Sequence, residues 1–109
     1  MRKIILFLAL LMVSSAFADE KPGRFFKDQP DVTNDPQVHF IYLLNKDSKD
    51  REWDINGKME SELMEVNEKF FEMTKGKQKF RYDMRKDGKL DISFVRLDKK
   101  FKGNYGMNY

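Results

Sequence analysis

The sequence predicts an α+β domain in the order β-α-β-β, with a three-stranded mixed sheet and one amphipathic helix on one face of that sheet. Three observations carry this prediction. A short apolar segment precedes a stretch with helical periodicity, two further strand-like segments follow it, and an Asp-Gly pair separates those two. A helix between two strands favours a right-handed crossover and a parallel pair, whereas Asp-Gly favours a tight antiparallel hairpin.

The first predicted strand covers residues 38–44, with the sequence VHFIYLL. It is rich in β-branched and aromatic residues, and Pro36 and Asn45 bound it. Apolar side chains occupy both of its faces, and only His39 interrupts them. A strand that is apolar on both faces is usually central in its sheet.

The predicted helix follows a charged loop over residues 45–54. Asp54 or Asn56 can cap its first turn, and Gly76 can take the left-handed conformation that ends a helix. Its apolar positions recur at intervals of three and four residues, which is the spacing of one helix face. They are Ile55, Met59, Leu63, Val66, Phe70 and Met73.

Two more strands are predicted over residues 79–84 and 90–97, with a tight turn at Asp87-Gly88 between them. The first of the two alternates between apolar and charged residues. Alternation of this kind is typical of a strand with one buried face. The expected inward positions are Phe80, Tyr82 and Met84, and the expected outward positions are Lys79, Arg81 and Asp83.

One helix leaves the second face of the sheet uncovered. Four candidates could cover this face: the pair Phe25-Phe26, an aromatic C-terminal segment, a second copy of the chain, or a further domain. The aromatic segment contains Phe101, Tyr105, Met107 and Tyr109.

The N-terminal segment has the features of a Sec-type signal peptide. Arg2-Lys3 precedes a short apolar run, and the small-residue site Ala16-Phe17-Ala18 comes before Asp19. The run is much shorter than the roughly 20 apolar residues of a transmembrane helix. We expect cleavage between Ala18 and Asp19 and export to the periplasm or the exterior. The expected divisions are a signal peptide (1–18), an extended leader (19–37), the α+β domain (38–98) and an aromatic tail (99–109).

Cleavage changes the charge of the chain. Removing 18 of the 109 residues leaves 91, and losing Arg2 and Lys3 lowers the net charge from +3 to +1. The remaining charges are abundant and of mixed sign, which is typical of a solvated surface. We therefore expect no nucleic-acid partner and no membrane partner once the signal peptide is removed.

The chain contains no cysteine and one histidine. Disulfides, thiol catalysis, cysteine-ligated metals and sites with two or three histidines are thereby excluded. No serine has a histidine at a recognisable spacing, so no serine triad is supported. The sequence predicts no catalytic residue, no cofactor and no metal ligand.

Several residues still invite a functional interpretation. For His39, a hydrogen-bonded core or sheet histidine is favoured over a ligand or an acid/base. The segment from Glu52 to Gly57 resembles the start of a calcium loop, but its twelfth position is Leu63 instead of glutamate, so a solvated loop with a helix cap is favoured. For Trp53, packing near the helix start is favoured over an exposed contact.

A basic stretch interleaved with Phe80 and Tyr82 could bind a polyanion, but a solvated edge strand is favoured because lysines block edge-to-edge pairing. Its cations are Lys75, Lys77, Lys79, Arg81, Arg85 and Lys86.

The strings VHFIYLLNKDSKDREWDINGK, FFEMTKGKQKFRYD and GKLDISFVRL together resemble the opening segment of a family of secreted, mostly uncharacterised bacterial proteins. The β-α-β-β order is also similar to the N-terminal subdomain of zincin-type metalloproteases. The resemblance covers residues 38–98. The zincin motif H-E-x-x-H is absent, so no catalytic residue carries over.

These observations indicate an exported, noncatalytic domain. We expect it to be a fragment or module of a larger secreted metalloprotease-like protein. The alternative is a free-standing exported binding protein that uses the open face or edge of its sheet. A protein partner or a missing domain fits both hypotheses, and the oligomeric state stays open.

Overall fold

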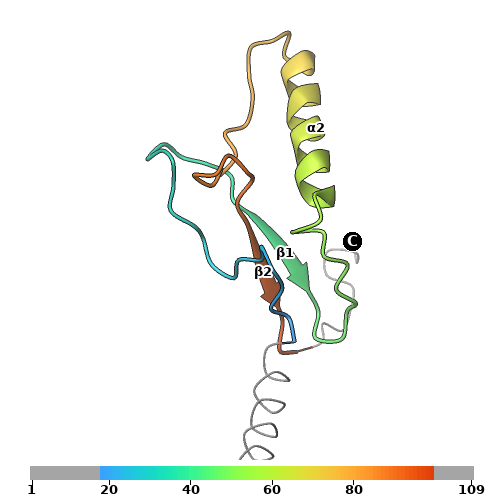
Figure 1. Cartoon of the computed structure of the whole chain (residues 1–109). Helices are drawn as coiled ribbons and strands as arrows, with labels where there is room; N and C mark the ends of the chain where they lie inside the picture. The colour runs from blue at the N-terminus through green and yellow to red at the C-terminus, as the bar shows by residue number, and fades with distance from the viewer. Residues whose placement is uncertain (1–17, 100–109) are drawn as a thin grey trace, which may run out of the picture.

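The structure, a computed structural model, describes residues 18–99. Its helix and two strands follow one another in the order strand, helix, strand (Figure 1). The strands pair in parallel, with Phe40 opposite Ile92 and Leu44 opposite Arg96. The elements are β1 (Phe40–Leu44), α2 (Lys58–Met73) and β2 (Ile92–Arg96).

Two sequence predictions lie at or beyond the limits of this range. The signal peptide, apart from Ala18, and the aromatic tail, apart from Lys99, fall outside the described residues. Cleavage between Ala18 and Asp19 therefore stays a prediction. Within residues 18–99, no helix is long and apolar enough to cross a membrane.

The predicted three-stranded mixed sheet is wrong, because the sheet has two strands. Residues 79–84 contribute only isolated bridges, a parallel one at Tyr82 and an antiparallel one at Met84. The reason lies at Asp83, whose N–H donates to the Val38 carbonyl at 2.9 Å while its C=O accepts from the Asp91 N–H at 2.9 Å. In a strand, both groups of one residue point to the same neighbour. Asp83 instead bonds to two different segments, so a regular ladder of strand hydrogen bonds does not continue through it.

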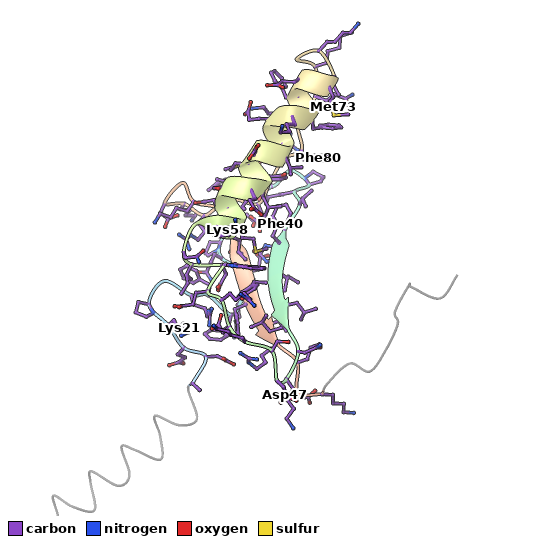
Figure 2. The ribbon with its side chains drawn as sticks, turned by 90° about the vertical axis from the view of Figure 1, so that its right-hand side faces the viewer. Lys21, Phe40, Asp47, Lys58, Met73 and Phe80 are labelled. Carbon is purple, nitrogen blue, oxygen red and sulfur yellow. The ribbon has the colours of Figure 1, made fainter. Side chains whose placement is uncertain are left out.

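The predicted helix is present, but it does not cover a face of the sheet. Asn56 Oδ1 accepts the N–H of Lys58 at 2.9 Å and so satisfies one free donor of the first turn. Only the first two turns reach the core, through Met59 and Leu63. The remainder of α2 extends past the sheet (Figure 1), and Met73 at its far end is 81% exposed (Figure 2).

Residues 74–82 return along the helix and are held to it by side-chain hydrogen bonds. Asn67, which is buried, donates to the Phe80 carbonyl at 2.9 Å and accepts the Phe80 N–H at 2.8 Å. The Tyr82 hydroxyl donates to the Leu63 carbonyl at 2.9 Å. Phe80 was expected to point inward. It lies beyond the sheet, half-exposed, and stacks on Phe70 with ring centroids 4.5 Å apart.

The core is small and centres on Phe94, which packs edge-on against Tyr42 and Phe26. The leader supplies part of its cover: Phe25 bridges to Ser93, and its carbonyl accepts the Phe94 N–H at 2.8 Å. The buried apolar residues are Tyr42, Leu44, Tyr82, Leu90, Ile92 and Phe94.

The leader covers β2 more fully than β1. In β1, Ile41 and Leu43 stay 52% and 53% exposed. The expectation of a strand buried on both faces therefore fails for β1.

Candidate functional site

One histidine and three aspartates converge where four chain segments meet. Asp28 comes from the leader, His39 immediately precedes β1, Asp83 follows the return segment, and Asp91 immediately precedes β2. The strands are parallel and in register, so the residues just before them lie side by side. One nitrogen or oxygen atom from each of the four lies within 4.8 Å of the others. We call this group the Asp-His cluster.

His39 occupies the middle of the Asp-His cluster. Its Nδ1 lies 2.8 Å from Asp83 Oδ2, 3.8 Å from Asp28 Oδ1 and 3.9 Å from Asp91 Oδ2. Its Nε2 lies 2.8 Å from Ser93 Oγ. Both ring nitrogens are hydrogen-bonded, as expected for a sheet histidine, but Nδ1 also faces the three carboxylates.

Two of the carboxylates are deeply buried and incompletely hydrogen-bonded. The side chains of Asp91 and Asp83 are 0% and 4% exposed, whereas that of Asp28 is 62% exposed. Asp91 Oδ2 accepts the backbone N–H of Gln29 at 2.9 Å. The Oδ1 atoms of Asp83 and Asp91 have no donor among the described residues. A buried acceptor without a donor is unfavourable, so these two oxygens call for a partner.

The acids raise one another's proton affinity. Burial raises the pKa of Asp83, the hydrogen bond to His39 opposes this, and neighbouring Asp28 and Asp91 raise it further. Burial also raises the pKa of Asp91. The hydrogen bond from the Gln29 N–H lowers this pKa, and neighbouring Asp28 raises it. Three carboxylates with one imidazole favour an added positive charge, either a proton or a metal ion.

Asp83, His39 and Ser93 also share the connectivity of a catalytic triad. Sequence spacing gave no sign of it, because the three residues come from separate segments. Ser93 is a poor nucleophile here because it lies within β2, bridges to Phe25 and is 6% exposed. Its hydroxyl is better placed to orient the imidazole ring than to attack a substrate.

The Asp-His cluster fits a four-coordinate divalent cation. Ligand atoms about 2.1 Å from a tetrahedral metal stand about 3.4 Å from one another. The Nδ1-to-oxygen distances of 2.8, 3.8 and 3.9 Å lie on both sides of that value. A hydrogen bond from Nε2–H to Ser93 Oγ would leave the Nδ1 lone pair free, as metal-binding histidines require.

His39 stands out in the sequence as the only histidine, whereas its three acidic neighbours were not predicted as site residues. Asp83 was expected to point outward, and the structure buries it. Asp91 carried a usable signal, since it is an acid inside the apolar string LDISF. Asp28 carried none, because nothing local distinguishes it from the other acids of the leader.

A second charged group holds the leader in place. The guanidinium of Arg24 binds Asp50 and Asp54 through four hydrogen bonds of 2.7–2.9 Å, and it donates to the Asp19 carbonyl at 2.8 Å. It also stacks 3.9 Å from the centroid of the Phe94 ring. We call Arg24, Asp50 and Asp54 the arginine clamp.

The arginine clamp accounts for Asp54, an acid of the segment that resembles the start of a calcium loop. The side chains of Asp54 and Arg24 are 1% and 0% exposed. Burial would lower the pKa of Arg24, but the hydrogen bonds and charges of Asp50 and Asp54 raise it; the bond from Arg24 lowers the pKa of Asp50. Asn56 Oδ1 accepts the N–H of Lys58, but the N-cap residue of α2 is Gly57, which provides no side-chain cap. Arg24 thus holds this loop, and Asp54 is buried instead of solvated.

The other residues singled out have ordinary contacts. In the basic stretch, Lys79 pairs with Glu68, Arg81 with Asp35 and Arg85 with Asp87. Trp53 lies against Tyr42 with ring centroids 6.2 Å apart, and it is 42% exposed.

No protein-family model, no curated protein and no solved structure matches this chain. The resemblance of residues 38–98 to a secreted bacterial family and to zincin subdomains therefore stays a prediction.

We predict that Arg24→Met destabilises the domain by about 3–5 kcal/mol, because two acids are left without their counter-charge in a buried place. The measurement is urea unfolding followed by circular dichroism. Arg81→Met is the matched control: its pair with Asp35 is exposed and 4.0 Å long, so its removal should change the unfolding free energy by about 1 kcal/mol or less. Equal effects of the two substitutions would contradict the role of the arginine clamp.

Proposed function

We propose that this chain is an exported, noncatalytic domain that binds a divalent transition-metal ion through Asp28, His39, Asp83 and Asp91. The observation that carries the proposal is the convergence of three carboxylates, two of them buried, on the imidazole of His39, with one donor atom from each residue within 4.8 Å of the others. Buried carboxylates are stable only when a proton, a cation or hydrogen bonds compensate their charge. A divalent ion would compensate all three acids at once.

The donor set favours Zn²⁺, and Mn²⁺ should bind more weakly. Three carboxylate oxygens alone would suit Ca²⁺ or Mg²⁺, but Ca²⁺ takes six to eight oxygen ligands and Mg²⁺ an octahedral shell. An imidazole nitrogen within a compact group of four donors suits Zn²⁺. The Irving–Williams order also places Zn²⁺ above Mn²⁺ for such a site.

A bound ion would join four separate segments of the chain: the leader, the start of β1, the return segment and the start of β2. Small secreted domains usually obtain such cross-links from disulfides, and this chain has no cysteine. Metal binding to a site absent from the unfolded chain adds directly to folding free energy. We therefore propose a structural role for the ion.

The wider setting rests on the sequence. Export is supported by the signal-peptide pattern ending at Ala18. A place within a larger secreted metalloprotease-like protein is supported by the resemblance of residues 38–98. The alternative, a free-standing binding protein, is supported by the exposure of Ile41 and Leu43 on β1.

We predict that residues 19–109 bind one equivalent of Zn²⁺ in isothermal titration calorimetry. Asp83→Asn and Asp91→Asn should each weaken binding by at least about 10-fold, and Ser93→Ala by about 10-fold through loss of the partner that orients His39. Asp87→Asn is the matched control, since Asp87 is exposed at the hairpin turn and pairs with Arg85. Wild-type affinity no greater than that of Asp91→Asn would contradict the site.

We also predict an unusual pH dependence for the metal-free domain. Asp83 and Asp91 bind protons more tightly in the folded chain than in the unfolded one, so they stabilise the fold at acid pH. This stabilisation is complete below about pH 4, the pKa of an aspartate in the unfolded chain. It is lost as pH rises through the raised pKa values of the folded chain. Zn²⁺ should reverse the trend, because it requires the deprotonated acids.

Melting temperatures from about pH 4 to 7 in EDTA and in Zn²⁺, for wild type and Asp91→Asn, measure this effect. The difference in melting temperature between wild type and Asp91→Asn isolates the effect of the Asp-His cluster, because acids with lowered pKa values, such as Asp50, are the same in both chains. In EDTA at neutral pH, Asp91→Asn should be the more stable chain, by about 1 kcal/mol. With Zn²⁺ present the order should invert. A variant less stable than wild type in EDTA would contradict the account.

A further inference from the structure

The outer edge of β1 is free within residues 18–99. The Leu44 carbonyl accepts the N–H of Leu97 at 2.9 Å, on the side of β2. In a parallel pair, alternate residues direct their peptide groups to the partner strand. The peptide groups of Ile41 and Leu43 therefore point to the opposite edge, where the described part of the chain places no strand.

A groove runs beside this edge and has an apolar wall. Its volume is about 550 Å³. Ile41, Leu43 and Trp53 line it and are between 42% and 53% exposed. Unpaired strand edges with exposed apolar side chains readily accept another strand. The other lining residues are Tyr42, Leu44, Ser48, Lys49 and Arg51.

Two cations give the groove its charge. Lys49 and Arg51 are exposed, and among residues 18–99 neither has a carboxylate within ion-pair distance. Asp50, which lies between them in the sequence, is bound by Arg24. Asp47 lies in the loop beyond the end of β1 (Figure 2) and does not line the groove. The lining of the groove therefore combines apolar and positively charged side chains.

We propose that this groove binds an extended, acidic segment of a partner protein, which adds a strand to the edge of β1. The peptide groups of Ile41 and Leu43 would hydrogen-bond to it, and its alternate apolar side chains would lie on Ile41 and Leu43. Its intervening carboxylates would pair with Lys49 and Arg51. The proposal deepens the alternative function, a binding protein that uses its sheet edge, and it does not depend on the metal site.

Trp53 is the only tryptophan of the chain, so its fluorescence reports on this groove. The probe is an acetylated and amidated peptide of sequence EVDVEVD, titrated into residues 19–109. We expect a saturable change in fluorescence, and binding at least about 10-fold weaker for the charge-reversed peptide KVKVKVK. The variant Lys49→Glu/Arg51→Glu should lose at least about 10-fold for EVDVEVD and regain affinity for KVKVKVK.

Two controls make the test decisive. Asp91→Asn should bind the peptide as wild type does, so that failure of the metal site and failure of the groove can be told apart. Replacing the central valine of the peptide by proline should abolish binding, because proline cannot donate to a strand edge.

No saturable change would overturn the proposal. So would peptide binding that appears only after residues 100–109 are removed, because that segment would then be the occupant. Concentration-dependent dimerisation that EVDVEVD fails to reverse would identify a second copy instead and would overturn it as well.

Discussion

Buried carboxylates in this small domain need a counter-charge, and the fold is arranged around two groups of them. In the arginine clamp, Asp50 and Asp54 share the guanidinium of Arg24, which hydrogen-bonds to both carboxylates. In the Asp-His cluster, three acids share one imidazole, and two buried oxygens have no donor among the described residues. The first group is complete within the chain. The second calls for a positive charge from outside, and this difference is why we assign it a ligand.

Both groups draw one member from the leader, Arg24 in one case and Asp28 in the other. Residues 19–37 contain no helix and no regular strand, yet they cover β2 and the Phe94 ring. Electrostatic contacts at two points thus make an extended segment part of the domain. A metal ion at the Asp-His cluster would strengthen the second point. In a chain without cysteine, that contribution would replace a covalent cross-link.

The elements with clear periodicity were predictable from the sequence, and the contacts between distant segments were not. The helix and the apolar strands β1 and β2 follow from the spacing of their apolar residues. The prediction of a third strand was wrong because the alternation of residues 79–84 placed Asp83 outward. In the structure, His39 and the backbone of Asp91 hold Asp83 inside. His39 stood out as the only histidine, but its acidic neighbours come from three other segments and form no local motif.

The most direct test of the metal site observes His39 itself. Because the chain has one histidine, its Cε1 proton gives a single resonance in the proton NMR spectrum. One equivalent of Zn²⁺ should move this resonance to a new position, further Zn²⁺ should have no effect, and EDTA should restore the original position. A resonance that stays in place throughout the titration would contradict the central claim.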